Sequence, residues 1–153
     1  MSLRSFRQVA ILGLLLAVVT PTANAQHSSN SIRQQQQNCY RLLQADNYDQ
    51  ALTCYHDVTQ RFSQINDTRG EALSLLNIGF IYGHLGNDID ALEPLERAVQ
   101  LANINNEIDW EIKALNNLGG SYASLDRHNE AISSLNRAVE LAAESGDLDD
   151  LSY

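Results

Sequence analysis

The sequence predicts an all-α protein in which three antiparallel helix pairs stack into a solenoid. When the 153-residue chain is shifted by 40 positions, residues 70–109 fall on the forty residues that follow them, without a gap. Apolar residues recur at helical spacing in both copies, and short polar turns separate the helical stretches. Self-similarity at a fixed period of about 20–50 residues is typical of stacked repeats. The residues that recur unchanged 40 positions later are Glu71, Leu75, Asn77, Gly79, Tyr82, Leu85, Ala91, Leu95, Arg97, Ala98, Val99, Leu101 and Ala102.

The first 25 residues have the layout of a secretory signal peptide. Arg4 and Arg7 make the start positive, residues 9–19 are apolar, and Ala23 and Ala25 supply the small side chains of a cleavage site. The apolar run is shorter than the ~20 residues that span a bilayer, which disfavours the alternative of an uncleaved membrane anchor. We therefore expect an exported protein, periplasmic or secreted, whose mature chain begins near Gln26.

Six helices are expected after residues 26–31, which are small and polar and are predicted to form a disordered lead. The expected helices cover residues 32–44 and 48–62, then 68–85 and 88–103, then 108–125 and 129–145. Asp, Asn and Gly gather in the stretches between them, where turns and helix caps need such residues. Pro94 lies inside the fourth helix and removes one backbone hydrogen bond, so we place it at a tolerated bend on an outer surface.

The residues in the helix seam resemble those of the tetratricopeptide repeat (TPR) family, and the period of 40 resembles its long-period variant. This resemblance implies a right-handed solenoid over residues 32–150. Residues 71–110 and 111–150 are the two good copies, and residues 32–70 form a degenerate first repeat with Cys39 and Tyr55 in the seam. The matching residues are Leu75, Ile78, Gly79, Tyr82, Ala91, Leu95 and Ala98, followed by Leu115, Leu118, Gly119, Tyr122, Ala131, Leu135 and Ala138.

The resemblance also implies that the first helix of each pair lines a groove for a peptide or protein partner. Amides at Gln37, Asn77 and Asn117 would form a column able to hydrogen-bond an extended backbone or a carboxylate, unless they only bond neighbouring helices. Leu76 and Phe80 suggest an apolar anchor pocket between them. The groove candidates are Gln37, Tyr40, Leu73, Leu76, Asn77, Phe80, His84, Lys113, Asn116 and Asn117, and the same reasoning adds Arg33, Gln36 and Ser124.

The chain has two cysteines, Cys39 and Cys54. In an antiparallel hairpin that turns near Asp46, they lie at similar heights on facing helices. Export would permit a disulfide, and closing this loop of about 16 residues would stabilise the fold by roughly 3 kcal/mol. The alternative is a pair of buried thiols, and the sequence leaves both open.

Charge and motifs argue against several other functions. The formal net charge is −9, and removal of a signal peptide holding two Arg and no acid would leave −11. An acidic surface repels phosphates and anionic lipid heads, so nucleic acid and membrane binding are disfavoured. The four His are scattered at positions 27, 56, 84 and 128, and no metal-site spacing, phosphate loop or nucleophile motif is present. We expect neither an enzyme nor a cofactor.

These observations favour a scaffold that binds another protein. Leu151–Tyr153 would correspond to the opening of a fourth repeat, so either the chain is a fragment of a longer protein or the apolar flank of the last helix meets a partner, including a second copy. The alternative function is the regulatory arm of a larger exported multidomain protein, for instance one with a peptidase domain. A reading frame that continues past Tyr153 would favour the arm.

Overall fold

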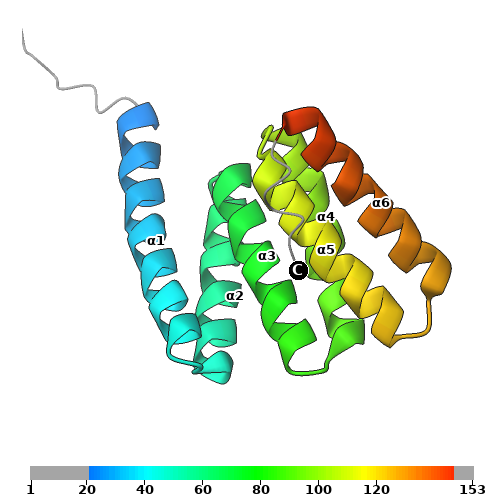
Figure 1. The fold of residues 1–153 in the computed structure, drawn as a ribbon. Helices are drawn as coiled ribbons and strands as arrows, with labels where there is room; N and C mark the ends of the chain where they lie inside the picture. The colour runs from blue at the N-terminus through cyan, green and yellow to red at the C-terminus, as the bar shows by residue number, and fades with distance from the viewer. Residues whose placement is uncertain (1–20, 147–153) are drawn as a thin grey trace, which may run out of the picture.

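The computed structural model of the protein describes residues 21–146, with side chains from Ser28 onward. Within this range the secondary structure is six α-helices and no strand. Figure 1 shows the helices succeeding one another as a row of antiparallel hairpins, which confirms the all-α solenoid. The helices are α1 (Pro21–Gln44), α2 (Tyr48–Gln64), α3 (Thr68–His84), α4 (Asp88–Ile104), α5 (Ile108–Ser124) and α6 (His128–Ser145).

The turns recur every 20 residues, at half the sequence period. At each one a single residue has a positive φ, between 56° and 75°. Asp, Asn and Gly adopt this left-handed conformation most readily, which explains why the sequence places these residues there. The six residues are Asp46, Asn66, Gly86, Asn106, Asp126 and Gly146.

Helix α1 begins earlier than the sequence suggested. It includes residues 26–31, so the expectation of a disordered lead is wrong. The Ser29 hydroxyl donates to Asp67 Oδ2 at 2.7 Å, and Arg33 pairs with the same carboxylate at 2.7 Å, which ties this part of α1 to the start of α3. The predicted signal peptide falls largely on residues 1–20, outside the described residues. Cleavage after Ala25 would leave residues 26–44 of the helix.

Core side chains form three clusters that follow the order of the helices. The first joins α1, α2 and α3 around Tyr55 and Phe62, both fully buried. The second joins α3, α4 and α5 around Leu95, and the third joins α5 to α6 around Ile112 with Val99 of α4 packed against it. Every cluster crosses from one helix pair to the next, so each pair depends on its neighbour for burial.

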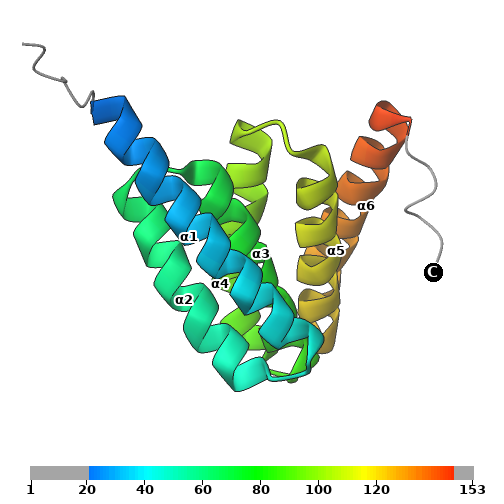
Figure 2. The ribbon, with the colours of Figure 1, turned by 90° about the vertical axis from the view of Figure 1, so that its left-hand side faces the viewer.

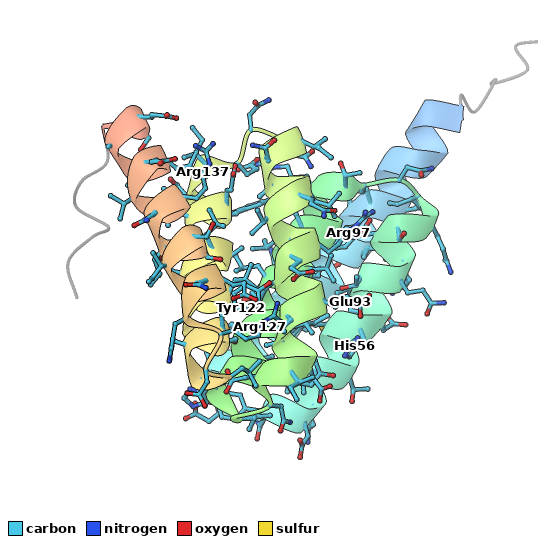
Figure 3. The ribbon with its side chains drawn as sticks, turned by 90° about the vertical axis from the view of Figure 1, so that its right-hand side faces the viewer. His56, Glu93, Arg97, Tyr122, Arg127 and Arg137 are labelled. Carbon is cyan, nitrogen blue, oxygen red and sulfur yellow. A yellow bond between two sulfur atoms is a disulfide. The ribbon has the colours of Figure 1, made fainter. Side chains whose placement is uncertain are left out.

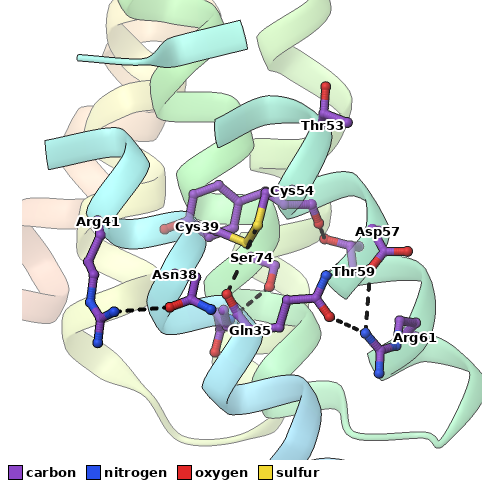
Figure 4. The surroundings of a disulfide bond; sticks show 12 residues. Gln35, Asn38, Cys39, Arg41, Thr53, Cys54, Asp57, Thr59, Arg61 and Ser74 are labelled. Carbon is purple, nitrogen blue, oxygen red and sulfur yellow. Dashed lines mark hydrogen bonds and ion pairs between the residues drawn. A yellow bond between two sulfur atoms is a disulfide. The ribbon is translucent and has the colours of Figure 1, made fainter. Parts of the chain in front are cut away.

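The first helix pair carries the disulfide that the sequence left open. Cys39 of α1 and Cys54 of α2 are bonded, with their Cα atoms 5.4 Å apart, and Cys39 is fully buried (Figure 4). Polar contacts reinforce the same hairpin, because Gln35 Nε2 of α1 donates to Asp57 of α2 at 2.8 Å and Arg61 donates to the Gln35 amide oxygen. A covalent link therefore joins the helices of the repeat whose motif is weakest.

The α1–α3 junction differs from the α3–α5 junction. Helix α3 packs directly against α5, whereas no comparable contact joins α1 to α3 within the described chain. Figure 2 shows α1 crossing in front of α2 and α3. The end of α1 and the middle of α3 line a common space, to which Tyr40, Leu43 and Leu76 contribute.

Candidate functional site

A groove opens on the face formed by α1, α3 and α5. Its volume is about 560 Å³. We call it the main groove. Helix α1 ends along one edge of it, α5 forms the other edge, and α3 supplies the floor. The lining residues are Tyr40, Leu43, Gln44, Asp46, Tyr48, Leu76, Asn77, Phe80, Lys113, Asn116 and Asn117.

Tyr40, Tyr48 and Phe80 form an aromatic wall of the main groove, and His84, which does not line this groove, contacts two of them. Phe80 and His84, one turn apart on α3, stack with ring centroids 6.0 Å apart, and the Tyr48 ring lies 4.9 Å from His84. Tyr40 is 50% exposed and Phe80 is 42% exposed, so two large rings face solvent beside the nearly buried Leu76. Tyr48 donates to Asp46 at 2.8 Å, and this hydrogen bond raises the pKa of the Tyr48 phenol. The wall offers apolar surface with its rings already oriented.

Polar groups on α3 and α5 form the opposite side. Asn77 Nδ2 donates to the Leu73 carbonyl of its own helix at 2.7 Å, which leaves its amide oxygen as an acceptor. Asn116 and Asn117 lie about one turn after Lys113 on α5, and none of the three has a hydrogen bond or ion pair within the described part of the chain. The amides therefore do not bond neighbouring helices, which was the competing interpretation. With respect to the described residues, the groove therefore presents the amides of Asn116 and Asn117 and the ammonium group of Lys113 without partners.

A smaller space of about 330 Å³ adjoins the main groove between α3 and α5. We call it the glycine hollow, because three of the residues that line it are glycines. It shares Phe80, Asn116 and Asn117 with the main groove. Its full lining is Gly79, Phe80, Gly83, His84, Asp88, Asn116, Asn117, Gly120, Ser121 and Ser124.

Comparison with known families accounts for most of this architecture. Two family models, both described as tetratricopeptide repeat, match residues 41–104 and residues 112–145. The chain is a tetratricopeptide repeat protein. Repeats of this family are generally non-catalytic and mediate protein–protein interactions, so the protein is an interaction scaffold. No curated protein sequence matches the chain. The first match begins near the end of α1 and includes α2, α3 and α4.

Seven predicted groove residues of the TPR face come together in the main groove. They are Tyr40, Leu76, Asn77, Phe80, Lys113, Asn116 and Asn117. His84 and Ser124 line the glycine hollow instead. Gln37 is exposed and lines neither space, while Leu73 packs partly buried against the second core cluster.

Two other expected groove residues belong to the α1–α3 junction. Gln36 is 8% exposed and donates to the Gly70 carbonyl at 3.1 Å and to Ser74 Oγ at 2.7 Å. Arg33 pairs with Asp67 and stacks over Phe62. Both expectations are wrong, because these two side chains of α1 bond to residues of α3 and of the turn before it and do not line the groove.

The sequence did not predict that the turn between α1 and α2 lines one end of the main groove. Leu43, Gln44, Asp46 and Tyr48 lie where α1 passes into α2. The family resemblance pointed only to the first helix of each pair, and Tyr48 opens the second helix. An aromatic residue directly after a turn was the available signal.

A third cavity of about 750 Å³ lies on the opposite face, between α2 and α4 and over α3. We call it the outer groove; Figure 3 shows its His56, Glu93 and Arg97. It is larger than the main groove, but several of its polar groups already have partners. Arg97 lies 3.6 Å from Glu71, and Tyr82 lies 3.3 Å from His56. The main groove, with its unpaired amides, is the better candidate for binding.

Two other features are not found among the described residues. No group of three or more His, Cys, Asp or Glu side chains there is placed to hold a metal ion. No helix in this range is both long and apolar enough to cross a membrane.

Proposed function

We propose that this protein is an exported TPR module that binds an extended peptide segment of a partner protein in the main groove. The observation that supports this most is the pairing of an exposed aromatic wall with free amides across one groove. Tyr40 and Phe80 are half-exposed, and Asn116 and Asn117 face them without partners in the described chain. Such a surface can bind both the backbone and an apolar side chain of one segment.

The two sides of the groove would contribute differently. Amide groups donate to and accept from a peptide backbone without selecting its side chains, so Asn77 and Asn117 favour an extended chain of varied sequence. Leu76 and Phe80 would hold an apolar anchor, which gives most of the affinity because aromatic and aliphatic pockets bury the most surface. Lys113 adds a positive charge at the α5 edge, where an acidic group of the partner would be favoured.

A selection from displayed random peptides tests this proposal. The purified protein should enrich peptides with an apolar anchor, and Phe80→Ala should weaken their binding by roughly tenfold or more, as hot-spot truncations do. Ile89→Ala is the matched control, since Ile89 is an exposed apolar residue of the outer groove at 73% exposure. If both substitutions weaken peptide binding equally, or if only Ile89→Ala weakens it, the main groove is not the binding site.

Export is proposed from two independent features. The first 25 residues have the composition of a signal peptide, and the Cys39–Cys54 bond requires an oxidising compartment to persist. Mass spectrometry of the protein recovered from the periplasm of a bacterial host should give a chain that starts near Gln26 with no free thiol. Retention of residues 1–25 in the cytoplasmic fraction would contradict export.

The exposed flank of α6 supports a second contact, which we assign to another copy of the chain. On α4, Leu92 and Val99 are partly buried against the second core cluster, while their counterparts Ile132 and Val139 on α6 are 58% and 48% exposed. Sedimentation velocity over a range of concentrations should show a dimer that Ile132→Ser with Val139→Ser returns to a monomer. A monomer at all concentrations would rule out this contact.

A further inference from the structure

The glycine hollow has a feature that peptide binding in the main groove does not use. Ser121 is 3% exposed, yet its hydroxyl makes no hydrogen bond to any described residue. The other two buried serines of the described chain bond to the carbonyl four residues earlier: Ser74 to Gly70 at 3.0 Å and Ser134 to Glu130 at 3.0 Å. The Ser121 hydroxyl oxygen is not among the buried atoms without a partner in the described chain, so it is open to the hollow that Ser121 lines and can bond to a group from outside the chain.

A second oxygen faces the same space. A methyl group placed on Gly83 would lie 3.5 Å from Ser121 Oγ and 4.0 Å from Asp88 Oδ1. The hydroxyl and the carboxylate therefore converge over Gly83 from two different helices, α5 and α4. Asp88 is half-buried and has no basic partner among the described residues, unlike Asp67, which pairs with Arg33. A half-buried carboxylate without a cation favours a positively charged ligand.

The space exists because side chains are missing at two positions. Gly83 corresponds to Ala123 in the next repeat, and Gly120 corresponds to Phe80 in the previous one. Nothing lies within 4 Å of the position that a methyl group on Gly120 would occupy. Glycine in the interior of a helix costs about 0.5–1 kcal/mol relative to Ala, so neither glycine improves the helix that carries it. Both of them open the hollow.

We propose that the glycine hollow is a subsite for a lysine or arginine side chain of the bound peptide. This rests on the proposed peptide binding, because the hollow shares Phe80, Asn116 and Asn117 with the main groove. The apolar anchor lies in the main groove, and a nearby basic side chain enters the hollow. Its N–H groups donate to Asp88 and Ser121. The Phe80 ring at the boundary offers a face on which a cation is also favoured. The acidic net charge of −9 attracts such a segment from solution.

The probes are random short peptides displayed on phage and selected on the purified protein, then synthesised singly. Selected peptides should carry Lys or Arg at a fixed distance from the apolar anchor, and replacing that residue with Gln should weaken binding about tenfold. Asp88→Asn should remove the preference for a basic residue. Asp90→Asn is its matched control, since it removes one charge from the same helical turn but lies in the outer groove.

Gly83→Ala provides the independent variant. Its methyl group would contact Ser121 at an ordinary distance, and Ala123 shows that the repeat accepts Ala at this position. The variant should melt at the same or a higher temperature than the wild type while it binds basic peptides about tenfold more weakly.

Three outcomes are distinguishable. A basic preference lost in Asp88→Asn and Gly83→Ala, but kept in Asp90→Asn, supports the subsite. Peptides that depend on Phe80 but show no basic preference overturn the subsite and leave the peptide groove standing. Failure to select any peptide that depends on Phe80 overturns both.

Discussion

The first and second repeats hold their two helices together at the same point in different ways. Position 39 of α1 corresponds to position 79 of α3, and position 55 of α2 corresponds to position 95 of α4. In the second repeat Gly79 lies directly against the fully buried Leu95, so close that a methyl group on Gly79 would overlap the Leu95 side chain. In the first repeat Cys39 takes the place of glycine, and its sulfur is bonded to Cys54.

The difference shows how a diverged repeat can stay in a solenoid. Glycine permits close backbone approach, and the leucine that fills the space above it binds the helices through buried apolar surface. Cys39 and the larger Tyr55 cannot pack in that way, and Tyr55 brings a buried hydroxyl for which no partner is found in the described chain. The disulfide adds stability to this helix pair by limiting the unfolded state.

The largest expected effect comes from removing this bond. Cys39→Ala with Cys54→Ala should lower the free energy of unfolding by about 3 kcal/mol, because a closed loop of roughly 15 residues is opened in the unfolded chain. Urea unfolding followed by circular dichroism measures this. Dithiothreitol should destabilise the wild type to a similar extent and leave the double variant unchanged. Equal midpoints for wild type and variant would mean that packing alone holds the first repeat.

Filling the glycine contact of the second repeat should have the next largest effect. Gly79→Ala should destabilise by about 2 kcal/mol, because the added methyl group has no space beside the buried Leu95. The equivalent Gly119→Ala should cost less: its methyl group would lie 2.8 Å from Leu135, which is only partly buried and has room to turn.

Gly120→Ala is the control for helix propensity. Its methyl group would meet nothing within 4 Å, so this variant should gain about 0.5–1 kcal/mol. If Gly79→Ala and Gly120→Ala have the same free energy of unfolding, the close approach of α3 to α4 is not the reason for glycine at position 79.

The fold could be predicted well from the sequence because the same pattern of apolar, glycine and turn residues occurs twice, 40 residues apart. Glycine occupies the same repeat position at residues 79 and 119, and turn residues recur at a regular spacing. These two features define the positions of helices α3 to α6 along the sequence. The start of α1 was missed, because its order comes from Ser29 and Arg33 bonding to Asp67, a contact across 38 and 34 residues of sequence. Local composition carries no sign of such a long-range contact.

The site was predictable only in part, for a related reason. The resemblance placed Asn77, Phe80 and Asn117 on one face, and the structure brings them into one groove. It could not show that Gln36 turns inward to Ser74, or that the first turn supplies Tyr48. Both depend on the separation of α1 from α3, which no single repeat encodes.

The junctions between repeats extend the comparison to Asp67, the N-cap of α3. Burial disfavours its charge, but hydrogen bonds from Ser29 and the Gly70 N–H, together with Arg33, lower the pKa of Asp67 below its usual value. Asp67→Asn keeps a capping amide oxygen but loses the charge that pairs with Arg33, so it should cost up to about 1 kcal/mol at neutral pH. A lowered pKa stabilises the fold above the unfolded value near 4, so this deficit should shrink as the pH falls below about 4.

Unfolding free energies of both chains between neutral pH and acid provide the measurement for Asp67. Glu107→Gln is the matched variant at the next junction, where Arg69 pairs with Glu107 but the Glu107 side chain caps no backbone N–H. It should cost less than Asp67→Asn. A larger cost for Glu107→Gln would show that the charge at the more buried Asp67 adds little.

The smallest effect is expected where one tyrosine position faces two different partners. Tyr122 of α5 donates to Glu96 of α4 at 2.6 Å, whereas the equivalent Tyr82 of α3 lies 3.3 Å from His56 of α2. Burial, followed by the bond to Glu96, raises the pKa of Tyr122 to about 12. Tyr122→Phe should cost only about 0.5 kcal/mol at neutral pH, since the exposed Glu96 regains water.

The pH dependence isolates that contact. The tyrosine of the unfolded chain ionises near pH 10, whereas Tyr122 of the folded chain ionises only near 12. The wild type therefore loses stability between these two pH values. Tyr122→Phe has no phenol at this position and does not undergo this loss. The deficit of Tyr122→Phe should therefore shrink or change sign between about pH 10 and 12 in thermal melts. Tyr82→Phe, which faces a histidine rather than a carboxylate, serves as the comparison at the preceding junction. A Tyr122→Phe deficit that stays constant to pH 12 would mean that the phenol ionises as readily in the folded chain as in the unfolded one, and the carboxylate at Glu96 would then not distinguish this junction from that of Tyr82.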